Sequence, residues 1–244
     1  MKKDVKKINR QFLFTMILFI LFIVLIVAII LIVDRYVKNS NYVYTILFTL
    51  FIIIIYVISV FRRKFYEITN ISYLLKIRNK PGKALIMKHS RNMSSFQNYL
   101  KRKGFIKFRA TQTHTIFYKA HKDHIKKIFR NYILEVVIIL PSDIEAFYID
   151  EVDEDIAKIQ HNQINNKQKI EKMLITQIKP ISDMNDLTKD AIKEIVFIKT
   201  KVGIVSTINI GLHYPSNQAI MLYSDEYSPS LYYKYHIDEI KDII

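Results

Sequence analysis

Two long stretches without a charged residue dominate the first quarter of this chain. Residues 12–33 are 22 consecutive uncharged residues, and residues 42–61 are 20 more. At about 1.5 Å of rise per residue, each stretch can cross the roughly 30 Å hydrocarbon core of a bilayer as one helix. Only eight residues separate them, so the helices are expected to turn straight back as an antiparallel pair. The sequence therefore predicts a two-pass transmembrane α-helical hairpin over residues 1–64.

The first stretch is expected to stay in the mature protein. It is longer than the roughly 7–15 apolar residues of a signal peptide, and Asp34 and Arg35 follow it without a small-residue cleavage site. Five Lys or Arg precede it, two lie in the turn and six lie in residues 62–81. Because basic flanks stay on the cytoplasmic side, both termini are expected in the cytoplasm. Scarce glycine beside abundant isoleucine, lysine and asparagine indicates an AT-rich bacterial genome, hence the inner membrane.

Composition excludes several kinds of chemistry. The chain has no cysteine, which excludes disulfides, thiolate nucleophiles, iron–sulfur clusters and cysteine-ligated zinc. It has four glycines, none of them clustered, which excludes the phosphate-cradling loops of kinases and dinucleotide-binding folds. No cofactor is therefore expected.

Residues 65–244 are predicted to form a cytoplasmic α+β domain with an antiparallel sheet. The run at 133–140 is apolar apart from Glu135, which predicts a central strand buried on both faces. The stretch at 161–168 is rich in Asn and Gln and could divide the domain into two parts. Residues 83–89 could be a strand or the start of a helix. Further strands are expected at 105–108, 115–119, 144–149, 195–200, 204–212, 218–224 and 231–237, and helices from Ser94 to Gly104, at 122–131, from Glu151 and at 186–194.

The positive charge of the chain is concentrated in one block. Residues 62–130 hold 19 Lys or Arg and two acids, whereas residues 131–157 hold eight acids and no Lys or Arg. A basic block of this density is typical of surfaces that bind phosphates of lipid headgroups or of nucleic acid. Interleaved aromatic residues could stack on nucleobases. The predicted phosphate-binding residues are Lys101, Arg102, Lys103, Lys107, Arg109, Lys126, Lys127 and Arg130.

Strand alternation sharpens this prediction, because it places Phe105, Lys107 and Arg109 on one face of a strand. Two alternatives stay open for the basic block. The bases could only set membrane topology and solubility, or the acids of residues 143–155 could fold back and neutralise them. A protein partner is a further candidate ligand.

An alternative interpretation is that the histidines and acids bind a metal ion. His114, His121 and His124 could supply ligands, but their spacing matches no known signature. The acids of residues 143–155, or Asp225 with the sequence Glu239-Ile240-Lys241, could serve a membrane-tethered, metal-dependent phosphodiester hydrolase. Enzymatic activity stays undecided. The leading hypothesis is a non-enzymatic binding or scaffolding module without a metal site.

Overall fold

A computed structural model describes residues 2–126, 131–142, 147–182, 186–199 and 203–244. The chain divides into two compact units, Met1–Asn79 and Lys80–Ile244. The first unit is a pair of helices, and the second holds a sheet with helices. Each unit is described by itself below.

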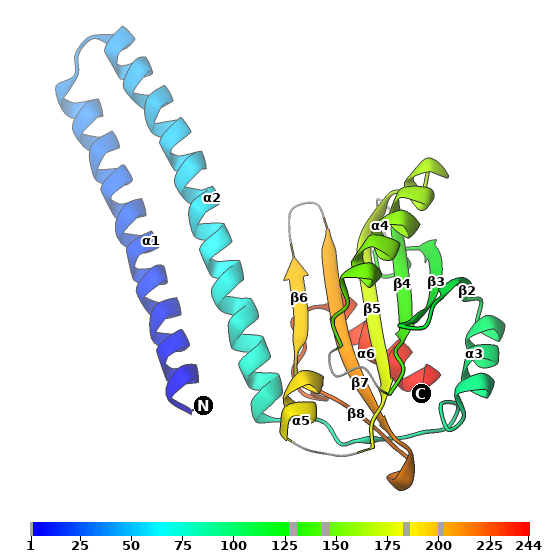
Figure 1. The fold of residues 1–244 in the computed structure, drawn as a ribbon. Coiled ribbons are helices and arrows are strands. Elements are labelled where there is room, and N and C mark those ends of the chain that lie inside the picture. The colour runs from blue at the N-terminus through cyan, green and yellow to red at the C-terminus, as the bar shows by residue number, and fades with distance from the viewer. Residues whose placement is uncertain (1, 127–130, 143–146, 183–185, 200–202) are drawn as a thin grey trace. The chain divides into compact units, whose positions relative to one another are not determined.

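The first unit consists of α1 (Lys2–Tyr36) and α2 (Ser40–Asn79), joined by residues 37–39 (Figure 1). Both helices are long and apolar enough to cross a membrane, by length and composition. Ring contacts join the two helices, with centroids 5.5 Å apart for Phe12 and Phe65 and 5.1 Å apart for Phe19 and Phe61. The two expected helices are thus present, and α2 continues well past the apolar stretch.

The second unit is built on one eight-stranded sheet with the order β1-β8-β7-β5-β4-β3-β2, and β6 also pairs with β7. Pairing is parallel between β4 and β5 and between β5 and β7, and antiparallel between the other paired strands. The prediction of an antiparallel sheet is therefore wrong, and the sheet is mixed. The strands are β1 (Leu85–Ile86), β2 (Ile106–Ala110), β3 (Thr115–Lys122), β4 (Tyr132–Ile139), β5 (Ile170–Pro180), β6 (Ile195–Lys199), β7 (Ile204–His213) and β8 (Gln218–Met221).

Helices cover both faces of this sheet (Figure 1). On one face lie α4 (Asp150–Asn165) and α5 (Asp186–Ile192), and on the other lies α6 (Leu231–Ile243). Helix α3 (Met93–Arg102) leads into β2 at the sheet edge, and a short 3₁₀ helix, η1 (Tyr214–Ser216), links β7 to β8. The parallel strands follow from the crossovers, since α4 carries the chain from the end of β4 back to the start of β5.

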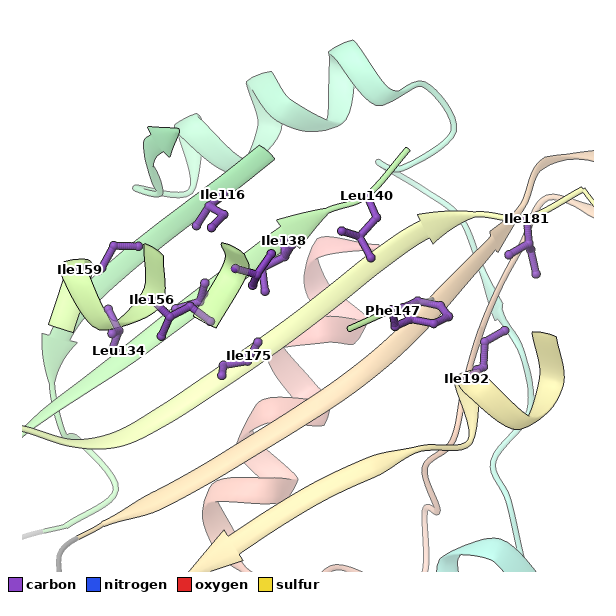
Figure 2. Packing of buried hydrophobic residues seen from close by; sticks show 12 residues of the cluster. Ile116, Leu134, Ile138, Leu140, Phe147, Ile156, Ile159, Ile175, Ile181 and Ile192 are labelled. Carbon is purple, nitrogen blue, oxygen red and sulfur yellow. The ribbon is translucent and has the colours of Figure 1, made fainter. Parts of the chain in front are cut away.

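The core beneath α4 is made of branched aliphatic side chains. Ile156 and Ile159 of α4 lie against Ile116, Leu134 and Ile138 of the sheet (Figure 2). Full burial of one such side chain contributes about 1.5–3 kcal/mol relative to exposure. The packing is equally close at Gly211, where there is no room for a side chain because a Cβ would lie 2.6 Å from Ile192 Cδ1.

Residues far apart in sequence meet at one edge of the domain. Leu85 of β1 pairs with Ala219 of β8. Directly after β1, the backbone N–H groups of Lys88 and His89 donate to the backbone oxygen of Ile244, at 2.8 and 2.9 Å. The short strand β1 is thus held by the last part of the domain.

Several predicted elements are confirmed. The strands expected at 105–108 and 115–119 form the β2–β3 hairpin, and the run at 133–140 gives β4, which lies between β3 and β5. The expected helix at 186–194 corresponds to α5. Helix α3 is also present, but its cap is Asn92, whose side chain accepts hydrogen bonds from the backbone of Ser94 and Ser95.

Other predictions are wrong. Residues 231–237 belong to helix α6 and not to a strand, and β5 was not expected. Residues 122–126 are the end of β3 and an irregular segment, not the start of a helix. Of the strand expected at 144–149, residues 147–149 lie outside any strand and the rest fall outside the described residues.

Replacement of Gly82 by alanine is expected to lower the free energy of unfolding by about 1–3 kcal/mol, because it overfills a packed site. A Cβ there would lie 2.2 Å from Tyr223 Cζ. The Tyr223 ring cannot swing away easily, since its hydroxyl donates to the Lys83 carbonyl at 2.9 Å and its own carbonyl accepts from Gly82 at 2.7 Å. Urea denaturation followed by near-ultraviolet circular dichroism would measure the loss. The exposed neighbour Lys83, replaced by alanine, should change stability by less than about 0.5 kcal/mol, and an equal effect of both changes would contradict the prediction.

Candidate phosphate-binding surface

The end of α3 exposes the first bases of the predicted surface. Phe96 and Leu100 are buried and face the core, which leaves Lys101 and Arg102 exposed. Gly104 then takes a positive φ of 88° and turns the chain into β2. Four bases therefore lie around one turn: Lys101, Arg102, Lys103 and Lys107, here called the α3–β2 basic group.

Members of this group differ in their partners. Lys103 Nζ lies 2.6 Å from Asp242 Oδ2, and this hydrogen bond raises the pKa of Lys103. Lys101, Arg102 and Lys107 have no carboxylate partner within the described part of the chain. Tyr99 organises the helix end, because its ring stacks on His89 at 3.9 Å and lies 5.8 Å from the Arg102 guanidinium carbon. Three exposed bases thus remain available for an external anion.

Arg109 does not belong to this group. A bulge lies between Lys107 and Arg109, so Lys107 pairs with Phe117 and Arg109 pairs with the adjacent Ile116. Adjacent residues of a strand point to opposite faces. The prediction that Lys107 and Arg109 share a face is therefore wrong, because the extra residue of the bulge reverses the alternation.

Acidic side chains pair with Arg109 and with Lys126. Arg109 Nη1 lies 3.1 Å from Asp155 Oδ1, and Lys126 Nζ lies 3.8 Å from Glu171 Oε2. Burial raises the pKa of Asp155, but hydrogen bonds from His114, Lys158 and Arg109 outweigh it, and the net pKa is lowered. The acidic block thus does fold back on one predicted base. Lys127 and Arg130 lie outside the described residues.

The interleaved aromatic residues face inward. Phe105 and Phe117 are buried, and the rings of Phe108 and Tyr118 pack edge to face with centroids 6.3 Å apart. Phe108 and Tyr118 also pack against the aliphatic core. These side chains are buried or partly buried in packing, so little of their ring surface is left on which nucleobases could stack.

The β3–β4 connection carries Lys126 and is anchored by a buried acid. Asp123 is 0% exposed, and its Oδ1 accepts hydrogen bonds from the backbone of Ile125 and Lys126 at 2.9 and 3.1 Å. Its Oδ2 accepts from the Tyr232 hydroxyl of α6 and lies 3.4 Å from Lys172 Nζ. Residues 123–126 thus form a turn fastened by one aspartate, where the start of the predicted helix was expected.

No protein-family model, curated protein or solved structure matches this chain. The arrangement of its own side chains is thus the basis for any functional proposal.

A hollow of about 690 Å³ lies where β4, β5 and β7 end. Ligands of open α/β sheets bind outside the carboxyl ends of parallel strands, so the place is suited to a ligand. Its described lining is mainly apolar, with hydroxyls from Thr111, Thr115, Ser142 and Ser182, and it includes no Asp or Glu. The hollow was not predicted from the sequence, because the parallel strand order that creates it has no local signal.

A second polar cluster lies beneath α6. Buried Glu135 accepts a hydrogen bond from the Tyr235 hydroxyl at 2.6 Å, and His121 Nε2 lies 2.9 Å from the same oxygen. Burial raises the pKa of Glu135, but these two hydrogen bonds outweigh it and lower the net pKa, and the hydrogen bond with Glu135 raises the pKa of His121. Burial also raises the pKa of Glu239. The space between Glu135 and Glu239 is about 10 Å³, which suits one water molecule and no substrate.

The two alternative acid sets of the hydrolase hypothesis lie on different parts of the domain, and in the second set Asp225 meets Lys241. Asp155 lies with α4 and Glu239 lies on α6, across the sheet, while Asp225 Oδ1 contacts Lys241 Nζ at 2.9 Å. His121 and His124 have ring centroids 5.5 Å apart, whereas His114 contacts Asp155. Within the described ranges, no group of three His, Asp or Glu is arranged to hold a metal ion.

Proposed function

We propose that this chain is a two-pass membrane protein whose folded domain binds anionic lipid headgroups through the α3–β2 basic group. The observation that carries the proposal is the presence of three exposed bases around one turn without a carboxylate partner in the described structure. Each base near an anionic leaflet contributes about 1 kcal/mol. Such a domain acts as a binding or scaffolding module at the membrane surface.

Exposure of the apolar helices supports the membrane part of the proposal. Only 11% of the apolar window of α1 and 6% of that of α2 is buried inside the structure. A core helix of a soluble domain would be covered by its own protein, whereas Phe14 and Phe48 are exposed. Contiguous apolar surface of this extent requires an apolar environment, and a bilayer supplies one.

The charges at the helix ends support an orientation with both termini in the cytoplasm. Because Phe12 contacts Phe65, the bases just before residue 12 lie at the level of the bases that follow Phe61. Both sets exceed the two bases of the turn, which favours their retention on the cytoplasmic side of an inner membrane.

The inward aromatic residues favour lipid over single-stranded nucleic acid. Proteins that bind single strands combine a basic groove with exposed stacking platforms. Here the aromatic residues of β2 and β3 are used in packing. Lipid phosphates need only the charge, which the exposed bases supply.

Substitution of Lys101, Arg102 and Lys107 by glutamine is expected to weaken binding of the fragment 80–244 to phosphatidylglycerol vesicles about a hundredfold, at about 1 kcal/mol per base. Vesicle sedimentation at 0.1 M salt would measure this, and wild-type binding should fall steeply with salt because screening shortens from ~10 Å at 0.1 M to ~3 Å at 1 M.

A matched control removes the same charge elsewhere. Lys83, Lys88 and Lys122 are also exposed and contact no carboxylate within the described residues, and their replacement by glutamine should weaken binding less than tenfold. Equal losses in the two triple variants would show that only total charge matters. A single-stranded oligonucleotide that outcompetes the vesicles would instead favour nucleic acid.

A further inference from the structure

Within the helical unit, a hollow of about 440 Å³ lies along one side of α2 and touches α1 at Phe19. Its α2 lining follows helical spacing, with every residue on one stripe of the helix. The stripe begins with apolar side chains and ends with polar ones, and Arg62 and Phe65 interleave between the two. In chain order the lining of α2 is Ile58, Phe61, Arg62, Phe65, Tyr66 and Thr69.

The apolar half of this hollow is walled by aromatic rings. Phe19 of α1 lies 5.1 Å from Phe61 and 6.2 Å from Phe65, measured between ring centroids, and Phe61 lies 6.4 Å from Phe65. These three rings and Ile58 present an apolar wall at the end of the stretch without charges. An acyl chain suits such a wall, and a free phosphate ion does not.

Arg62 supplies a cation at the polar half. Its guanidinium carbon lies 5.8 Å from the centroid of the Tyr66 ring, and no carboxylate contacts it in the described structure. The neighbouring Arg63 differs, since its Nε lies 3.1 Å from Glu67 Oε1. Of these two adjacent arginines, Arg63 is therefore paired with a carboxylate and Arg62 is not.

Thr69 adds a free hydroxyl. The hydroxyls of Thr15, Thr45 and Thr49 donate to the carbonyl four residues earlier, at 2.8 to 2.9 Å. The Thr69 hydroxyl makes no such bond in the described structure. It lies two turns beyond Arg62 on the same stripe, where it can donate to a headgroup oxygen.

We propose that this hollow binds one anionic phospholipid, with its acyl chain along Phe19, Phe61 and Phe65 and its headgroup at Arg62 and Thr69. The inference rests on the proposed membrane insertion of the hairpin, and it names a site separate from the α3–β2 basic group. The uncompensated guanidinium selects an anionic headgroup, because a zwitterionic one brings its own cation to the same place.

Native mass spectrometry of the full chain, released from a mild detergent, would test this site with phosphatidylglycerol and phosphatidylcholine as probes. Wild type is expected to retain one phosphatidylglycerol and at least tenfold less phosphatidylcholine. Arg62→Gln should reduce phosphatidylglycerol retention about tenfold, and Thr69→Val should reduce it severalfold. Arg63→Gln is the matched control, and it should retain phosphatidylglycerol as wild type does.

Equal losses in Arg62→Gln and Arg63→Gln would overturn the proposal, because general attraction to a basic helix end would then explain retention. Equal retention of the two lipids would overturn it as well. The variant that lacks Lys101, Arg102 and Lys107 should retain the lipid as wild type does. Failure at Arg62 is thereby distinguished from failure of the domain surface, which the vesicle assay on fragment 80–244 measures separately.

Discussion

Replacing Asp123 with alanine is expected to lower the free energy of unfolding of the domain by about 3–5 kcal/mol, the range for loss of one partner of a buried ion pair. The change removes the acceptor of the Tyr232 hydroxyl and of two backbone N–H groups. It also leaves Lys172, which is 2% exposed, with Glu171 at 2.7 Å as its remaining carboxylate contact. Urea denaturation of fragment 80–244 would measure the loss.

An exposed ion pair provides the control for this variant. Asp225 contacts Lys241 at the surface, and Asp225→Ala should cost less than about 1 kcal/mol because water replaces the lost partner. Tyr232→Phe removes one hydrogen bond to a charged acceptor and should cost about 1.5–3 kcal/mol. A loss below about 1 kcal/mol for Asp123→Ala would show that Asp123 does not anchor the connection.

Acidification from pH 7.5 to pH 5 is expected to destabilise the domain through His236. This side chain is buried between the hydroxyls of Thr176 and Ser206, at 2.9 and 3.0 Å, and burial lowers its pKa to about 3. Unfolding returns the pKa to about 6.5, so between pH 6.5 and pH 3 the unfolded state binds the extra proton. The contribution of His236 to stability therefore falls by about 1.4 kcal/mol for each pH unit below 6.5.

Two variants separate this effect from other titrating groups. His236→Gln should flatten the fall in stability, as followed by urea midpoints at each pH. His121 has the opposite sign, because its pKa is raised and its protonated form is stabilised in the folded state. Its contribution is fully present below the unfolded pKa and is lost as the pH rises through the folded value, so His121→Gln should change the pH dependence of stability above pH 6.5 and leave the slope below pH 6.5 unchanged. Identical slopes in wild type and His236→Gln would contradict the prediction.

The sequence of helix α6 contains a helical signal, but in the prediction the strand propensity of its residues outweighed that signal. Residues 231–237 hold three Tyr and one Ile, residue types that favour strands. Yet Tyr233, Ile237 and Ile240 recur at helical spacing and are all buried, and Ser230 caps the helix by accepting from the Tyr233 N–H at 3.1 Å. The helical period and the cap together are stronger evidence than the strand propensity of single residues. A strand would place Tyr232 and Tyr233 on opposite faces, whereas both are buried here.

The mixed sheet could not be predicted from local pattern. Strand β5 pairs in parallel with both β4 and β7, and each pairing is reached only through a crossover. An apolar run of suitable length can at best identify such a strand. Which strands become its neighbours depends on how the helices pack. The central position of β4 was predictable because its run is apolar on both faces.

The candidate surface was partly predictable. The sequence shows that the bases cluster, but it does not show which of them are paired with acids in the folded domain. Lys103 and Asp242 are 139 residues apart, and Arg109 and Asp155 are 46 apart. Such pairings depend on tertiary structure. The bulge between Lys107 and Arg109 is equally hidden, because it shifts one side chain without a glycine or proline to mark it.

The dependence of β1 on the far end of the domain has a consequence for biosynthesis. Leu85 finds its partner only when Ala219 has been made, and the amides of Lys88 and His89 find theirs only with Ile244. Contacts of such long sequence separation form slowly, because chain entropy is lost before any pairing is gained. The apolar helices, in contrast, leave the ribosome early and need only each other and their surroundings. Strand β1 can therefore join the sheet only after residues up to Ile244 have been synthesised, and until then its partner edge on β8 stays unpaired.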